Sequence, residues 1–182
     1  MGSEMCIRDS GTGATGMFYY SAFGQEEFRQ REFVEEESLP TLVDSKLKVE
    51  EVVGGLDTPT TMAFLGPNDF LILEKDKGTV LRVTDGKVSD QPLLDVNVAN
   101  SVERCMCGIA ISKHGSTTYV FLYYTEQDGG QKILGNRLYR YEWANEKLVN
   151  PLLLLDLPAT SPQKGQENNH DGGKVVVGPD HN

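Results

Sequence analysis

A unit of four short β-strand patterns occurs twice in this chain and starts a third time. Each pattern is rich in leucine, aromatic or β-branched residues, and most are bounded by turn-forming Gly, Pro, Asn or Asp. The patterns lie at 61–65, 70–74, 79–83 and 93–96 in the first copy, and at 107–111, 119–124, 137–142 and 151–156 in the second. A third copy begins with the β-branched run 175–177, which is followed by a Gly-Pro-Asp turn. Short strands joined by tight turns predict antiparallel meanders.

Repetition of a four-strand unit predicts an all-β fold of the β-propeller class. The copies recur about every 45 to 65 residues, near the ~40–50-residue periods of propeller repeats. An insert at 159–169 lengthens the second copy. The main alternative is a β-sandwich with meander connections. The matching turns favour the propeller, with about two blades and the first strand of a third in this chain.

The propeller region is expected to cover residues 47–182. We expect 1–46 to be a non-native or flexible segment, because 1–10 resemble translated adapter sequence and 11–16 are rich in Gly, Thr and Ala. A strand is expected after the last turn, so we interpret the chain as the front part of a longer protein, truncated at its C-terminus. Such a fragment leaves strand edges and apolar faces unpaired, and it is expected to be poorly soluble or to self-associate.

Composition excludes several classes of function. The 182 residues are 38% hydrophobic and 24% charged, which is typical of a globular protein. A net charge of −10 argues against nucleic-acid binding, which needs a basic surface, and disfavours an anionic membrane surface. No run approaches the ~18 apolar residues of a membrane span. The apolar stretch 17–23 is too short for an intact export signal.

Two of the three cysteines lie close together in the second copy. Cys105 and Cys107 would share one face of a regular strand, where they could not easily bridge each other. Two cysteines without a nearby histidine also make a poor zinc site. We therefore interpret both as small buried residues and predict no metal ligands in this chain.

The candidate site lies in the loops that precede the first strand of each copy. In a propeller these loops gather at one mouth of the central axis, so Glu103 and His170 should face the same cavity. Taken alone, His170 could be a solvated loop histidine, but its equivalence to Glu103 favours a functional role. A carboxylate and an imidazole together suit the binding and deprotonation of a hydroxyl substrate. Gly172 and Gly173 lack a Cβ, so another backbone or a flat ligand can come close.

Four stretches together resemble the glucose/sorbosone dehydrogenase family. They are the opening 55–64, the Glu-Arg-containing run 103–110, the run 135–141 and the His-Asp-Gly-Gly run 170–180. The resemblance covers the chain from about residue 47 onward. It implies a six-bladed propeller in the complete protein, which oxidises an aldose with pyrroloquinoline quinone (PQQ) and calcium. It also implies an exported protein, and it allows a homodimer of the full-length chain.

The resemblance implies a role for each candidate residue. His170 would be the general base that takes the sugar hydroxyl proton while hydride passes to the quinone. Gly172 and Gly173 would allow close approach of the flat cofactor. Glu103 and Asn169 would contact the substrate.

The sequence also departs from the family pattern. Cys105 stands where the family usually has glycine and Cys107 where it usually has leucine, so the pocket could differ. The acid that orients the histidine, the cationic quinone contacts and the calcium ligands are expected beyond Asn182. This chain alone is therefore not expected to bind quinone or oxidise sugar. Two other functions stay open, a non-catalytic propeller that binds a protein or glycan partner and a lactonase-type hydrolase. For the hydrolase, Glu103 alone is thin support.

Overall fold

The computed structural model describes residues 42–101, 103–130, 132–159 and 171–179. The chain divides into two compact units, 1–50 and 51–182. Both groups of strands lie in the second unit, and the described residues contain β-strands and loops but no helix. Asn169 and His170 fall outside the described residues.

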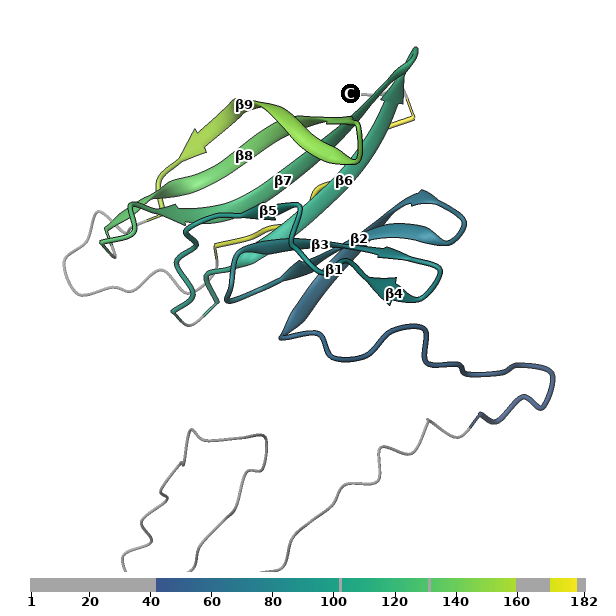
Figure 1. Ribbon diagram of the computed structural model, residues 1–182. Helices are drawn as coiled ribbons and strands as arrows, with labels where there is room; N and C mark the ends of the chain where they lie inside the picture. Colours follow the sequence, from purple (N-terminus) through teal and green to yellow (C-terminus); the bar gives the residue numbers. More distant parts are fainter. Residues whose placement is uncertain (1–41, 102, 131, 160–170, 180–182) are drawn as a thin grey trace, which may run out of the picture. The chain divides into compact units, whose positions relative to one another are not determined.

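The first copy of the repeat forms one antiparallel sheet (Figure 1). Strands β1 (Pro59–Gly66), β2 (Asp69–Glu74) and β3 (Thr79–Thr84) pair in chain order, as predicted. The predicted fourth strand at 93–96 is reduced to the two-residue β5 (Leu94–Asp95), which shares the edge of β3 with β4 (Lys87–Val88). The chain reverses at once after β3, because Asp85 and Gly86 both have positive φ (50° and 75°).

The second copy forms a four-stranded antiparallel sheet with strands in sequence order. Its strands are β6 (Met106–His114), β7 (Thr117–Gln127), β8 (Ile133–Ala144) and β9 (Lys147–Leu157). All four predicted patterns are confirmed, and each strand extends beyond its pattern at one end or both. The hydrogen-bonded ladder extends the strands because it continues through flanking polar residues that a hydrophobic pattern does not mark.

One apolar core joins the two sheets. Alternate residues of β2 and β3 point toward the second sheet and meet alternate residues of β6, β7 and β8. The buried members of this core are Leu71, Leu73, Val80, Val98, Met106, Ile109, Val120, Leu122, Tyr124 and Tyr141. Hydrogen bonds between the start of β6 and the first sheet also connect the two sheets. The Thr60 hydroxyl donates to the Met106 carbonyl at 2.9 Å, and the Met106 amide donates to the Lys75 carbonyl at 3.1 Å.

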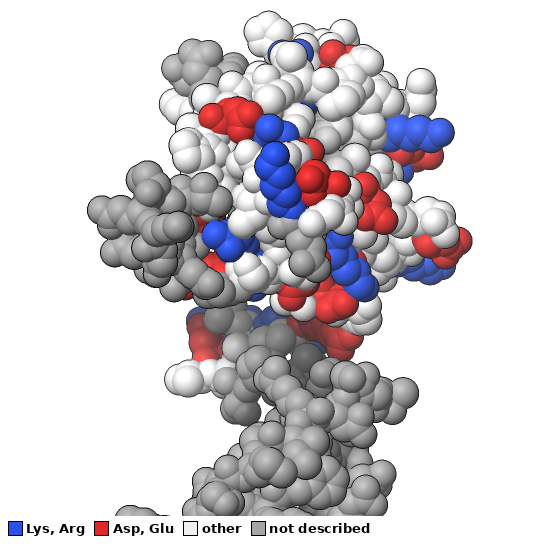
Figure 2. All heavy atoms as spheres, turned by 90° about the vertical axis from the view of Figure 1, so that its left-hand side faces the viewer, with Lys and Arg blue, Asp and Glu red and all other residues white. Residues whose placement is uncertain are grey.

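Arg82 of β3 makes a second connection between the sheets. It donates from Nε and Nη2 to the two carboxylate oxygens of Asp69 at 2.8 and 2.9 Å, and from Nη1 to Glu146 beyond β8 at 2.8 Å. Its guanidinium carbon also lies 5.2 Å from the ring centroid of Trp143. Such pairing of opposite charges recurs on the surface, where Figure 2 shows Lys and Arg interspersed with Asp and Glu.

The predicted first strand of a third copy, 175–177, is not a strand in this structure. The expected alternation of side chains is present, since Val176 is 74% exposed while Val175 and Val177 are half-buried. A strand also needs a backbone hydrogen-bonding partner, and no described residue pairs with this segment. The prediction was therefore wrong for the backbone.

The edge strand β9 and the start of the first sheet expose large apolar side chains. The leucines at 152, 153, 154, 155 and 157 are each 40–49% exposed, and Met62 and Phe64 are 53% and 57% exposed. We expect the 182-residue chain, expressed by itself, to self-associate because contiguous apolar surface next to an open strand edge favours association. Light scattering after size exclusion measures this. Serine at positions 152–155 should reduce the association, and a monodisperse, cooperatively melting parent chain would contradict the expectation.

Acid should weaken the link between Asp69 and Arg82. The hydrogen bonds from Arg82 lower the pKa of the Asp69 carboxyl below its ordinary value. The stability that this pair contributes is therefore complete above about pH 4 and is lost as the pH falls through the lowered pKa. We expect Asp69→Asn to destabilise the purified protein at pH 7 and to have a smaller effect at pH 2. Urea unfolding at both values measures this, and a destabilisation that is equal at both would contradict it.

Candidate functional site

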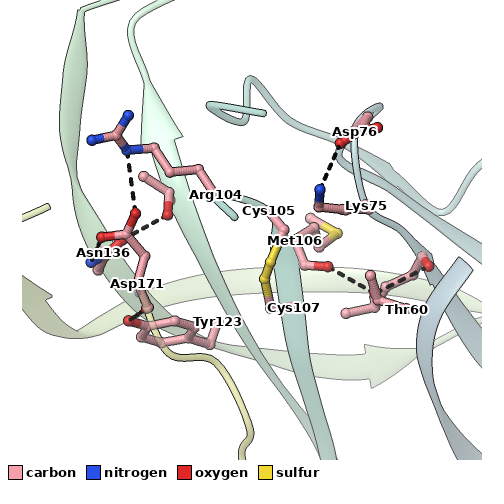
Figure 3. The surroundings of a disulfide bond; sticks show 12 residues. Thr60, Lys75, Asp76, Arg104, Cys105, Met106, Cys107, Tyr123, Asn136 and Asp171 are labelled. Atoms are coloured by element: carbon pink, nitrogen blue, oxygen red, sulfur yellow. Dashed lines mark hydrogen bonds and ion pairs between the residues drawn. A yellow bond between two sulfur atoms is a disulfide. The ribbon is translucent and has the colours of Figure 1, made fainter. Parts of the chain in front are cut away.

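A buried ion pair lies between the start of β6 and the segment that follows His170. Arg104 Nε is 3.3 Å from Asp171 Oδ2, and the two side chains are only 10% and 4% exposed (Figure 3). The other carboxylate oxygen of Asp171 accepts a hydrogen bond from the Asn136 side-chain amide at 3.1 Å. Asn136 in turn accepts one from the Thr125 hydroxyl at 2.6 Å. The pair thus continues into a buried polar network on β7 and β8.

Arg104 also contacts Ala159, the residue that precedes the segment 160–170. Its Nη2 donates to the Ala159 carbonyl at 3.3 Å. Ala159 directly precedes residues 160–170, and Asp171 directly follows them. One guanidinium therefore contacts both ends of the segment that carries Asn169 and His170. Arg104 is itself held by Ser101, which accepts from Nη1 at 3.1 Å and from the Arg104 amide at 3.2 Å.

Tyr123 fixes the backbone of Asp171. Its hydroxyl donates to the Asp171 carbonyl at 2.7 Å. Burial raises the pKa of the Tyr123 phenol, and the negative charge of Asp171 raises it further. The phenol therefore remains protonated and able to donate at neutral pH. The residue next to His170 is held by its carbonyl as well as by its carboxylate.

The structure places Glu103 one residue before this network. Glu103 is exposed and lies in the turn that leads into β6. Its chain neighbour Arg104 contacts Asp171, the chain neighbour of His170. The residue after Glu103 and the residue after His170 therefore meet at the start of β6. The placement of the His170 and Asn169 side chains remains a prediction.

The two glycines after Asp171 have different surroundings. A Cβ on Gly173 would stand 2.5 Å from the Cβ of Cys107, and a Cβ on Gly108 would overlap the Gly173 carbonyl oxygen. The room that glycine leaves at 173 is thus filled by β6. Gly172 is exposed, and among the described residues the Tyr123 hydroxyl lies 3.8 Å from its Cβ position, an ordinary contact distance. Both glycines have positive φ (67° and 149°), which side chains rarely adopt.

Cys105 and Cys107 form a disulfide, so the prediction that they would not bridge was wrong. The prediction assumed a regular strand, in which residues two apart are separated by roughly 6.6 Å. Here Cys105 precedes β6, and the pairing register shifts between Met106 and Gly108, so Cys107 is an extra residue at a bulge. The two Cα atoms are 5.2 Å apart, within the range of disulfides. Cys105 is buried, as predicted, and Cys107 is half-buried.

Four residues of this site were not singled out from the sequence: Arg104, Tyr123, Asn136 and Asp171. Arg104, Asn136 and Asp171 each belong to a different one of the stretches that carry the family resemblance. Because these three side chains are charged or can form hydrogen bonds, their position in those stretches could have marked them as candidates. For Tyr123 the sequence shows only that it belongs to a strand rich in aromatic residues. Its partner is a backbone carbonyl, which no residue type encodes.

The described residues show neither a metal-ligating cluster nor a membrane-spanning helix. No three His, Cys, Asp or Glu side chains within 42–101, 103–130, 132–159 and 171–179 are grouped to hold a metal ion. No helix long and apolar enough to cross a membrane occurs in the same ranges.

The two antiparallel sheets are two blades of a β-propeller fold. A sequence model described as glucose/sorbosone dehydrogenase matches residues 56–182, so this chain belongs to the glucose/sorbosone dehydrogenase family. The PQQ-bound form of the aldose sugar dehydrogenase from Streptomyces coelicolor is similar in structure, with a TM-score of 0.57 and 26% identity. A crystal structure of a glucose dehydrogenase is similar in fold, with a TM-score of 0.54 and 19% identity. The predicted fold and family are confirmed.

This chain corresponds to part of each solved structure. The match with the aldose sugar dehydrogenase covers 73% of this chain and 38% of that protein. The match with the glucose dehydrogenase covers 70% of this chain and 36% of that protein. A search of curated proteins gave no match.

Breaking the buried ion pair between Arg104 and Asp171 should lower the free energy of unfolding more than breaking an exposed ion pair. Asp171→Asn leaves Arg104 charged and unpaired inside the protein, which typically costs about 3–5 kcal/mol in the free energy of unfolding. Asp156→Asn is a matched control, because Asp156 pairs with Arg137 but its side chain is 47% exposed. We expect little change from the control. Urea unfolding of both variants measures the difference.

A double-mutant cycle then tests whether Arg104 and Asp171 act on each other. Combining Arg104→Gln with Asp171→Asn should destabilise the protein by less than the sum of the single changes, because neither buried group then carries an unpaired charge. Additive effects, or an Asp171→Asn effect no larger than that of Asp156→Asn, would contradict the buried pair.

Proposed function

We propose that this chain forms two adjacent blades of a quinone-dependent sugar dehydrogenase that oxidises an aldose hydroxyl. The proposal rests on family membership together with one structural observation. Arg104 contacts Ala159 and Asp171, the residues on either side of the segment with the candidate base. Burying a charge pair carries a large desolvation cost, and here the pair lies next in sequence to both His170 and Glu103.

His170 is the proposed general base. In this role it accepts the substrate hydroxyl proton at an imidazole nitrogen, as a neutral imidazole can do near neutral pH. Asp171, the residue that follows His170, is held through its carboxylate by Arg104 and Asn136 and through its carbonyl by Tyr123. A positioned base typically contributes ~10²–10⁴-fold to the rate.

PQQ, when bound, supplies the hydride acceptor. Gly172 is the proposed contact for this flat group, because it is exposed and no described atom crowds its Cβ position more closely than the Tyr123 hydroxyl at 3.8 Å. Gly173 was also predicted to contact the cofactor. Its open side is filled by Cys107, so we propose that it supports Gly172 by packing on β6. Calcium belongs to the proposal through the family resemblance, and we assign no residue of this chain to it.

Glu103 and Asn169 are the proposed substrate contacts. The exposed Glu103 carboxylate can accept hydrogen bonds from sugar hydroxyls. Asn169 precedes the base and offers both a donor and an acceptor. We also propose that the protein is exported, which the Cys105–Cys107 disulfide supports because disulfides persist in oxidising compartments.

Dye reduction by the complete protein tests the function. With PQQ, calcium and a panel of aldoses, we expect sugar-dependent reduction of an artificial electron acceptor. His170→Ala should lower kcat/KM by at least ~10²-fold, because the positioned base is lost. His114→Ala is the matched control, because His114 is exposed at the end of β6, and it should leave the rate unchanged.

Two results would contradict the proposal, one against the dehydrogenase function and one against the role of His170. If no aldose supports dye reduction by quinone-loaded protein, the dehydrogenase function fails. If the protein is active but His170→Ala keeps the parental rate, the function stands and His170 is not its base.

A further inference from the structure

The Cys105–Cys107 disulfide lies between the two parts of the candidate site. Cys105 directly follows Arg104, which pairs with Asp171 (Figure 3). Arg104 also donates a hydrogen bond to Ala159, so it contacts the residues on either side of 160–170. Cys107 packs against Gly173, because a Cβ added there would stand 2.5 Å from the Cys107 Cβ and 3.5 Å from its sulfur. The bridge therefore connects the Arg104 side of the site to the glycine segment.

The main chain around the bridge is held by other interactions. The Cys105 carbonyl accepts a hydrogen bond from the Thr125 amide at 3.1 Å. The Met106 amide donates to Lys75 at 3.1 Å, and the Met106 carbonyl accepts from Thr60 at 2.9 Å. Met106 itself is fully buried in the core between the sheets. Opening the bridge should thus leave the blade folded and change mainly how Cys107 packs on Gly173.

The bridge is poorly placed to serve global stability. Disulfides stabilise a fold mainly by restricting the unfolded chain, and this effect grows with the length of the closed loop. The loop closed here contains Met106 as its single intervening residue, so the stabilisation expected from this effect is small. The bridge is also open to chemistry at one end, since Cys107 is half-buried whereas Cys105 is 5% exposed.

We propose that the Cys105–Cys107 disulfide is a thiol-exchange site whose reduction loosens the glycine segment and weakens quinone binding there. The quinone part rests on the proposed function. A thiolate of a small dithiol attacks the Cys107 sulfur, the disulfide bond breaks, and Cys105 leaves as a thiolate that takes up a proton. The second thiol of the reagent then displaces Cys107 from the mixed disulfide. Two electrons pass from the dithiol to the protein, and the reagent ends as a disulfide.

Three measurements on the complete protein test this proposal, each before and after native treatment with dithiothreitol that is then removed. Alkylation with mass spectrometry reports the state of the two cysteines. Hydrogen exchange reports the mobility of 171–178, with peptides from β2 and β3 as the internal control. Titration with PQQ reports its affinity. The double variant Cys105→Ser, Cys107→Ser controls for effects of the reagent elsewhere.

We expect no alkylation of Cys105 and Cys107 before treatment and two added alkyl groups afterwards. Reduction should speed exchange in 171–178 but not in β2 and β3, and it should weaken PQQ binding several-fold. The double variant should match the reduced protein and not respond to the reagent.

Different results separate this proposal from the proposed function. Alkylation before treatment, resistance of the bridge to native reduction, or unchanged exchange and PQQ affinity after reduction would each overturn the exchange site. If exchange and PQQ affinity respond to reduction but no aldose is oxidised, the exchange site stands and the dehydrogenase function fails.

Discussion

The buried contact between Arg104 and Asp171 is the interaction on which the candidate site depends. Removing two charges from water is costly, and hydrogen bonds to Ser101, Asn136 and Ala159 offset part of this cost. The two facing atoms, Arg104 Nε and Asp171 Oδ2, make an ion pair without a hydrogen bond among the described residues. The partners come from separate parts of the chain, before β6, on β8 and after β9. The network can form only when the second sheet and the segment after 170 are in place, so folding of this sheet and site assembly are coupled.

The fold could be predicted largely from sequence because its determinants are local. Alternating apolar residues and turn formers set the strands of each copy, and the matching turns indicated repetition. The strand predictions were wrong where a strand depends on pairing with a segment that is distant in the sequence. The pattern at 93–96 shares the edge of β3 with Lys87–Val88, each pairing with two different residues of that strand, and 175–177 has no backbone partner among the described residues. A strand-like sequence becomes a strand only when another chain segment completes its hydrogen bonds.

The sequence predicts where the candidate site lies but not the interactions around it. Loop equivalence between copies predicts that Glu103 and His170 face one cavity, and this stays a prediction. Their chain neighbours, Arg104 and Asp171, are in contact. The disulfide was missed because a bulge at Cys107 changes the spacing that a regular strand would impose. The packing of Gly173 against Cys107 and Gly108 was missed for a related reason. Glycine indicates that something comes close, but its residue type does not tell whether a ligand or the protein itself fills the space.

The arrangement of the site can be tested with a crystal structure of the complete protein with bound PQQ. We expect the His170 imidazole and the Glu103 carboxylate to face one cavity, with the quinone against Gly172 and Arg104 in contact with Ala159 and Asp171. This expectation would be contradicted if His170 and Glu103 lay at opposite ends of the blades, or if the quinone were bound away from Gly172.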